Sequence, residues 1–177
     1  MNLPRSLLLA LVLILTAASF GQTQAAQNQS SPAPDFLAYQ ALFRSVVWLE
    51  NQAGQEDAKL GAGNPSSTSI RSQILKAAGL TDVEYAALVA IAQDYVKAQA
   101  AYIGARDLVL TAVYAQQAAG GRATWAQAIQ LSDLFKQHVA MVDDHIAQLA
   151  DRVGGPGAQS LANYVHTTVA ANTVWSH

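Results

Sequence analysis

The stretch that decides the fold is Thr81–Gly121, TDVEYAALVAIAQDYVKAQAAYIGARDLVLTAVYAQQAAGG. It opens with a capping box, in which the Thr81 hydroxyl accepts the backbone N–H of Glu84 and the Glu84 carboxylate accepts the backbone N–H of Thr81. No proline follows, and only one internal glycine precedes the closing Gly-Gly pair. The stretch therefore predicts one helix over about 82–118, roughly 55 Å long at about 1.5 Å per residue.

Apolar side chains recur along this helix every seven residues in three parallel rows. The rows are Leu88, Tyr95, Tyr102 and Val109; Ile91, Ala98, Ala105 and Ala112; and Val89, Val96, Ile103 and Leu110. A heptad seam with a second apolar row beside it is typical of a helix that packs against more than one partner. The small side chains of the alanine row favour the close approach of one of these partners.

A second long helix is predicted over about 124–153. It begins at another capping box, TWAQ (Thr124–Gln127), and ends at the glycine-rich turn GGPG. Its apolar seam consists of Trp125, Ala128, Ser132, Phe135, Val139, Val142, Ile146, Leu149 and Val153. Since only a short Gly-Gly turn separates the two long helices, we expect them to form an antiparallel hairpin.

Three shorter helices complete the expected fold. Asp35 can cap a first helix that carries apolar residues at spacings of three and four and ends near Gly54, before a loop over 54–67. A short helix follows over 69–78, and a last helix over 157–172 carries Leu161, Val165 and Val169. No strand pattern is present. The sequence predicts an all-α antiparallel helical bundle, closest to an up-and-down four-helix bundle with one broken member.

The N-terminus has the order of a secretory signal peptide: a basic start at Arg5, an apolar run over Leu7–Ala18, then small and polar residues. The run of about 12 residues is short for a bilayer span, which needs roughly 20. We therefore expect a signal peptide over 1–25, a disordered polar leader over 26–34 and one helical domain over 35–177. The expected location is periplasmic or extracellular, with no membrane span after cleavage. The composition, rich in Ala and Gln and free of cysteine, suggests a bacterial host.

The charge pattern argues against two classes of partner. The formal net charge is −2, charged residues make up 12% of the chain, and its basic residues are scattered singly. Nucleic acids and anionic membranes bind concentrated positive surfaces, so neither is an expected partner. Cysteine is absent, so the fold depends on its apolar core rather than on disulfide bonds.

Catalytic signatures are missing from the sequence. It contains no Gly-x-Ser-x-Gly, His-Glu-x-x-His or P-loop pattern, and no cysteine nucleophile. None of its three glutamates has a histidine three residues later, as the carboxylate-bridged di-metal bundles require. We therefore expect a protein that is not an enzyme and carries no cofactor.

The stretch HVAMVDDH (138–145) is the one concentration of metal-binding side chains. His138, Met141 and His145 share a helical stripe, and His166 can approach it if the last helix packs there. Such a set suits copper or zinc, although two histidines seven residues apart lie farther apart than the usual spacing of four. The favoured alternative is a boundary stripe half-covered by a neighbouring helix. The adjacent Asp143 and Asp144 point about 100° apart, as expected of a solvated face.

The segment GLTDVEYAALVAIA is similar to the Leu-Thr-x-x-Gln helix starts of small periplasmic stress-response and chaperone bundles. It has Glu84 in place of the glutamine, occurs once and covers less than a tenth of the chain, and a capping box accounts for the same letters. Two functional hypotheses follow from the sequence as a whole. One is an envelope protein that binds a protein or peptide as adaptor, chaperone or scaffold, and the other is a periplasmic copper or zinc binder.

Overall fold

The computed structural model describes residues 34–172, so the predicted signal peptide and nearly all of the predicted leader lie outside the described residues. The described helices are α2 (Pro34–Leu60), α3 (Pro65–Ala77), α4 (Asp82–Ala118), α5 (Trp125–Val153) and α6 (Gly155–Tyr164), followed by a π-helical turn η2 (Val165–Val169) and α7 (Ala170–Asn172). The prediction of an all-α helical bundle is confirmed. None of these helices combines the length and the apolar character needed to cross a membrane.

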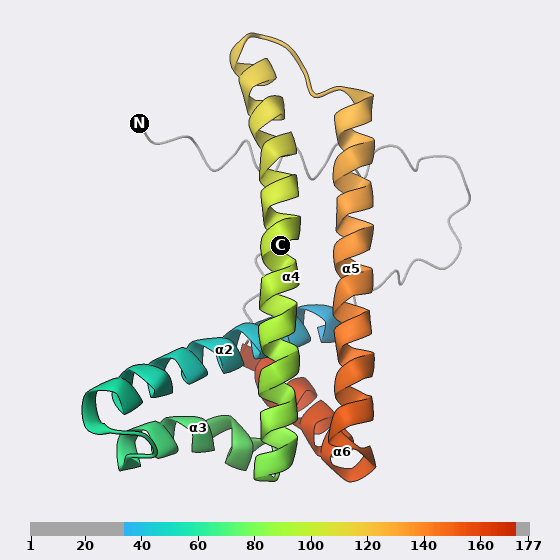
Figure 1. Ribbon diagram of the computed structural model, residues 1–177. Coiled ribbons are helices and arrows are strands. Elements are labelled where there is room, and N and C mark those ends of the chain that lie inside the picture. Colours follow the sequence, from blue (N-terminus) through green and yellow to red (C-terminus); the bar gives the residue numbers. More distant parts are fainter. Residues whose placement is uncertain (1–33, 173–177) are drawn as a thin grey trace.

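The two long helices lie side by side and run in opposite directions, joined by a loop at one end of the molecule (Figure 1). Both predicted capping boxes are present. The Thr81 N–H donates to Glu84 Oε2 at 2.7 Å, and the Thr124 N–H donates to Gln127 Oε1 at 2.7 Å. These side chains satisfy backbone donors that a helix start leaves without partners, which is why both helices begin where the sequence predicts.

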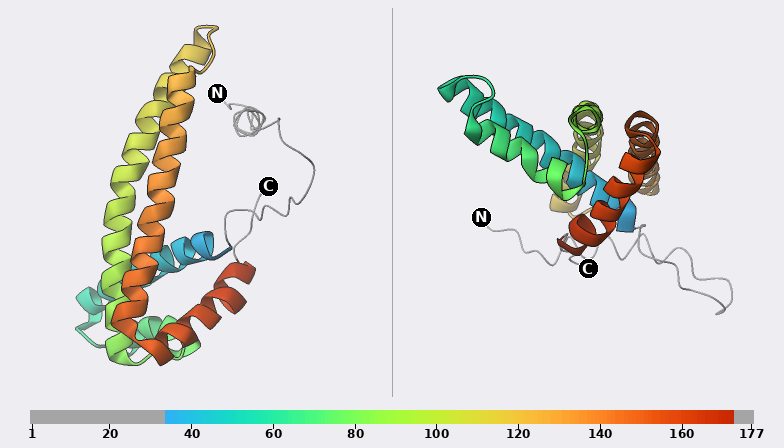
Figure 2. Two further views of the ribbon diagram at one scale, coloured as in Figure 1. Left: turned by 90° about the vertical axis from the view of Figure 1, so that its right-hand side faces the viewer. Right: turned by 90° about the horizontal axis from the view of Figure 1, so that it is seen from below.

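The shorter helices pack on one end of this hairpin and not along its whole length. Helix α2 crosses the two long helices, and its beginning and α6 lie on the same side of the hairpin (Figures 1 and 2). The buried core gathers at this end and includes Leu42, Phe43, Leu88, Ile91, Tyr95, Val142, Leu149, Leu161 and Val165. The expectation of an up-and-down bundle is therefore corrected, because α2 lies across the hairpin rather than alongside it.

Helix α2 continues beyond the glycine at which it is expected to end. It passes Gly54 and stops at Leu60, and α3 begins at Pro65, where the Asn64 side chain accepts the N–H groups of the first turn. Arg71 of α3 forms ion pairs with Glu50 at 3.1 Å and with Asp57 at 2.9 Å. These contacts hold the end of α2 against α3 and offset the roughly 1 kcal/mol that an internal glycine costs a helix.

The C-terminal segment is also less regular than predicted. Helix α6 begins at Gly155, two residues earlier than expected, and a π-helical turn interrupts the helix from Val165 to Val169. Gly157 is buried, and a Cβ atom there would collide with the side chains of Glu84 and Val153. A glycine at this position therefore lets α6 approach the start of α4 closely.

The other half of the hairpin extends past the shorter helices. We call residues 103–137 the outer hairpin, and the remaining described residues the base. Within the outer hairpin Ala105 and Ala112 are exposed, and Trp125 of the predicted α5 seam is 71% exposed. The heptad pattern correctly predicts that this part of α4 is helical. The expected second packing partner is missing along most of this part of the hairpin, because α2 reaches it only at its edge, where Phe36 packs against Phe135.

Candidate functional site

The outer hairpin carries most of the large apolar side chains that the described residues expose to solvent. Eight such residues are exposed, and five of them belong to the outer hairpin: Leu108, Tyr114, Trp125, Ile129 and Phe135. Leu108 is 75% exposed, more than Trp125. Single exposed apolar residues are common on any protein, whereas large contiguous apolar patches are often associated with binding.

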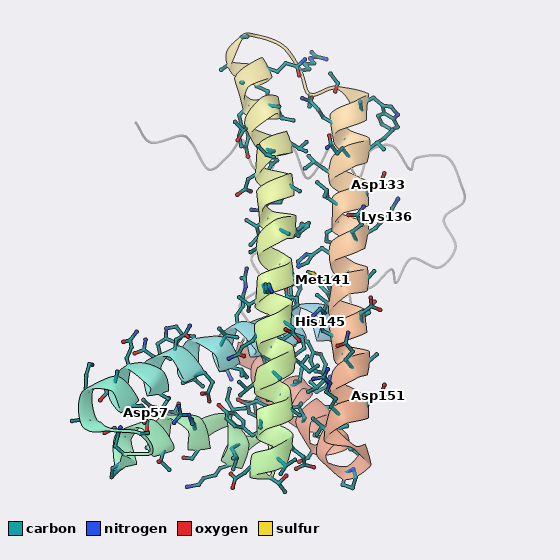
Figure 3. All side chains as sticks on the ribbon, in the orientation of Figure 1. Asp57, Asp133, Lys136, Met141, His145 and Asp151 are labelled. Atoms are coloured by element: carbon teal, nitrogen blue, oxygen red, sulfur yellow. The ribbon has the colours of Figure 1, made fainter. Side chains whose placement is uncertain are left out.

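Charges on the outer hairpin largely cancel one another locally. Arg106 forms an ion pair with its neighbour Asp107 at 2.7 Å, and Lys136 forms one with Asp133 at 3.2 Å. Asp133 and Lys136 lie on the edge of α5 that points away from α4 (Figure 3). A shallow, open depression runs along α5 and is lined by Ala126, Ile129, Gln130, Asp133, Leu134 and Gln137. A partner can therefore cover this surface without burying a cluster of like charges that lack counter-ions.

A compact polar cluster lies where α2, α4 and α5 meet, next to the outer hairpin. Its centre is His138, which is 7% exposed. The Tyr102 ring stacks on the His138 ring with centroids 4.0 Å apart and planes 14° apart, and Phe36 meets it edge-on at 5.5 Å. The His138 Nε2 atom lies 3.3 Å from the Tyr95 hydroxyl and 3.4 Å from Gln99 Nε2.

Hydrogen-bond directions in this cluster follow from Arg44, whose Nε can only donate. It donates to Gln99 Oε1 at 3.0 Å, so the amide nitrogen of Gln99 faces the Tyr95 hydroxyl at 2.5 Å and also His138. His138 Nε2 is therefore an acceptor, and the neutral ring carries its proton on Nδ1. Burial lowers the pKa of His138, and the positive charges of Arg44 and Arg106 lower it further.

The other side chains predicted as metal ligands have separate partners. The His145 Nδ1 atom donates to the Met141 carbonyl oxygen at 2.6 Å, and its ring packs against Tyr95. Met141 is partly buried against the core, and both residues lie on the stretch of α5 that faces α4 (Figure 3). His166 Nδ1 lies 3.1 Å from Asp35 Oδ1, in an exposed pair.

Across residues 34–172, no three His, Asp or Glu side chains are grouped in a way that could hold a metal ion. The metal hypothesis thus gains no support and stays an untested prediction. His138 and His145 are buried, more deeply than the half-covered boundary predicted for them. Asp143 and Asp144 are exposed, as expected of a solvated face.

Sequence reasoning missed the polar partners of His138. The heptad pattern places Tyr95 and Tyr102 on the apolar seam, and Tyr95 is fully buried there, but the pattern does not point to Gln99 or Arg44. A signal was available: Gln99 follows Tyr95 by four residues, so it shares the core-facing side of the helix. A glutamine on such a face requires buried partners.

Comparisons with known proteins assign no family. No protein-family model matches the chain, and neither a curated protein nor a solved structure matches it.

Proposed function

We propose that this protein is a non-enzymatic helical bundle of the periplasm or the extracellular space, and that it binds a protein or peptide partner through the outer hairpin. Its role is that of an adaptor, chaperone or scaffold. The location rests on the signal-peptide pattern of the N-terminal residues. The binding role rests on the surface of the outer hairpin.

The observation that carries the proposal is the unpartnered apolar surface of an otherwise well-formed helix pair. Tryptophan and tyrosine are over-represented among the residues that dominate binding energy, since each buries a large area at a low cost in conformational entropy. Trp125 and Tyr114 are both exposed on the outer hairpin. Neither contributes to the core cluster, so folding alone does not account for their placement.

The expected partner presents an apolar face. The local ion pairs Arg106–Asp107 and Lys136–Asp133 leave little net charge to attract an oppositely charged surface. Binding should therefore depend on burial of apolar area and change little between low and physiological salt. An amphipathic helix laid against the hairpin meets this description, because its apolar positions recur at the spacings that a helical surface offers.

Site-specific photo-cross-linking in the native host tests this proposal. A photoreactive phenylalanine analogue replaces Trp125 or Ile129 in the outer hairpin, and Trp48 or Val83 in the matched controls. All four side chains are exposed, Trp125 at 71%, Ile129 at 46%, Trp48 at 61% and Val83 at 81%, so a partner can reach the probe at every position. We expect a discrete cross-linked adduct from the two outer-hairpin positions and none from the controls. Equal labelling from all four positions, or no adduct from any, would contradict the proposal.

A further inference from the structure

We propose that His138 is an acid-sensitive latch that holds the first half of α2 against the two long helices. The latch is closed while the imidazole is neutral and opens when it takes up a proton. This inference concerns the coupling between α2 and the hairpin. It does not depend on whether the outer hairpin binds a partner.

Three helices meet at this one ring. From α2, Phe36 contacts the edge of the ring, and the Gln40 amide nitrogen lies 3.5 Å from Nε2. From α4, Tyr102 covers the face of the ring, and the Tyr95 hydroxyl and Gln99 amide approach Nε2. A single imidazole on α5 thus joins both neighbouring helices.

Among the described residues, two charged groups act on this ring, and both are positive, although Arg106 is itself paired with Asp107 at 2.7 Å. Arg44 approaches from α2, and Arg106 approaches from α4, where its guanidinium carbon lies 6.0 Å from the centre of the Tyr102 ring. The titratable groups nearby are the phenols of Tyr95 and Tyr102 on α4, and His145 one heptad along α5, which shares the Tyr95 contact. Within the part of the chain that the structure describes, no carboxylate pairs with His138.

Protonation of His138 would add an N–H at Nε2, which already faces the amide N–H donors of Gln99 and Gln40. Gln99 cannot turn its oxygen toward the ring, because Arg44 holds that oxygen with a hydrogen bond it can only donate. Gln40 can turn its amide and the Tyr95 hydroxyl can accept the new N–H, but neither group carries a negative charge, and the nearby Arg44 guanidinium is positive. Burying a charge without a counter-ion is costly, so the protonated ring is stabilised when α2 moves away and water reaches it.

The direction of the pH effect follows from linkage. A folded-state pKa below that of the free side chain means that the closed state binds fewer protons than the open state. The contribution of the latch is complete above the unfolded pKa of about 6.5 and is lost as the pH falls below it, through the lowered pKa of the closed state. In that range one proton is taken up on opening, so the opening constant rises by up to about tenfold per pH unit.

Opening would expose apolar surface beside the outer hairpin. Phe36 packs against Phe135, with ring centroids 6.3 Å apart, and Phe43 packs against Tyr95 at 5.1 Å. Both contacts join the first half of α2 to a long helix. Release of α2 at acidic pH therefore enlarges the apolar area around Phe135 at the edge of the outer hairpin.

Amide hydrogen exchange of residues 34–48, measured on the full chain between pH 7.5 and 5.0 and corrected for intrinsic exchange rates, tests the latch. We expect opening of this segment to increase by up to about tenfold per pH unit below about 6.5. The variant Gln99→Glu supplies a carboxylate between Arg44 and His138, so the dependence should reverse, with opening decreasing toward low pH. His138→Phe, which keeps a ring for Tyr102 to stack on, should abolish it.

The control variants are His145→Gln, on the same face of α5, and His166→Gln, in the exposed pair with Asp35. Both should retain the acid-induced opening of residues 34–48. The latch is refuted if the wild-type segment does not open toward pH 5, or if the acid response persists unchanged in Gln99→Glu. If the acid-induced opening is lost in His145→Gln but kept in His138→Phe, the response arises from His145, and the inference is overturned. If His138→Phe does not fold, Gln99→Glu decides alone.

Discussion

At the scale of single residues, aromatic side chains of the same helix differ in burial: some belong to the core and others face solvent. Phe43 of α2 is completely buried and packs its ring against Tyr95, whereas Trp48, five residues later on the same helix, is 61% exposed. Burial also raises the pKa of the Tyr95 phenol to about 12, so Tyr95 stays protonated and can donate to His138 throughout the physiological range. Tyr95 therefore joins the apolar core to the polar cluster of the base, through its ring contact with Phe43 and its hydroxyl contact with His138.

Replacing Phe43 by alanine should lower the free energy of unfolding by about 3–5 kcal/mol, because it removes a fully buried ring and leaves a cavity. Trp48→Ala on the same helix is the matched control and should change it by no more than about 0.5 kcal/mol. Urea denaturation followed by circular dichroism measures both. Similar losses in the two variants would show that α2 does not face the core as described.

At the scale of elements, helix starts are determined locally, whereas helix partners are not. Each long helix begins at a threonine whose hydroxyl accepts the N–H three residues later, at 3.3 Å for Thr81 and 3.2 Å for Thr124. The two caps have the same chemistry but different surroundings. Thr81 precedes the first turns of α4, where Tyr85 and Leu88 are buried, whereas Thr124 precedes the exposed Trp125.

Loss of either cap should weaken its helix start by about 1 kcal/mol, with different consequences. Thr81→Ala should lower the global free energy of unfolding by about that amount, because the first turn of α4 belongs to the cooperative core. Thr124→Ala should chiefly accelerate hydrogen exchange in residues 125–131, because that end can open locally. Hydrogen exchange and urea denaturation on both variants distinguish the two cases, and equal global losses would contradict them.

The sequence therefore predicts the fold class and the bounds of both long helices, whose capping boxes and glycine turns are local signals. It misplaces the end of α2, because the ion pairs from Arg71 to Glu50 and Asp57 join residues far apart in the chain. The π-helical turn has no local signature either. For the candidate site, the helical stripe of His138 and His145 is predictable, but the partners that bury them depend on how α2 crosses the hairpin.

At the scale of the whole molecule, the distribution of packing is uneven. The apolar heptads continue along α4 and α5 at both ends of the hairpin, but α2, α3 and α6 cover only one end (Figures 1 and 2). A repeating pattern in sequence shows that a face is apolar, and it does not show which part of that face finds a partner within the chain. Among the residues described, most of the outer hairpin lacks such a partner, and α2 contacts it only at Phe135. The proposed binding function follows from this difference.

The most direct test of this account is a comparison of stability and binding in one double variant, Trp125→Gln with Ile129→Gln. We expect its free energy of unfolding to stay within about 1 kcal/mol of the wild type, since exposed side chains contribute little to the core. The partner that is cross-linked from the outer hairpin should no longer be retained. If the double variant instead unfolds readily, or binds that partner as well as the wild type does, then the outer hairpin is not the binding surface.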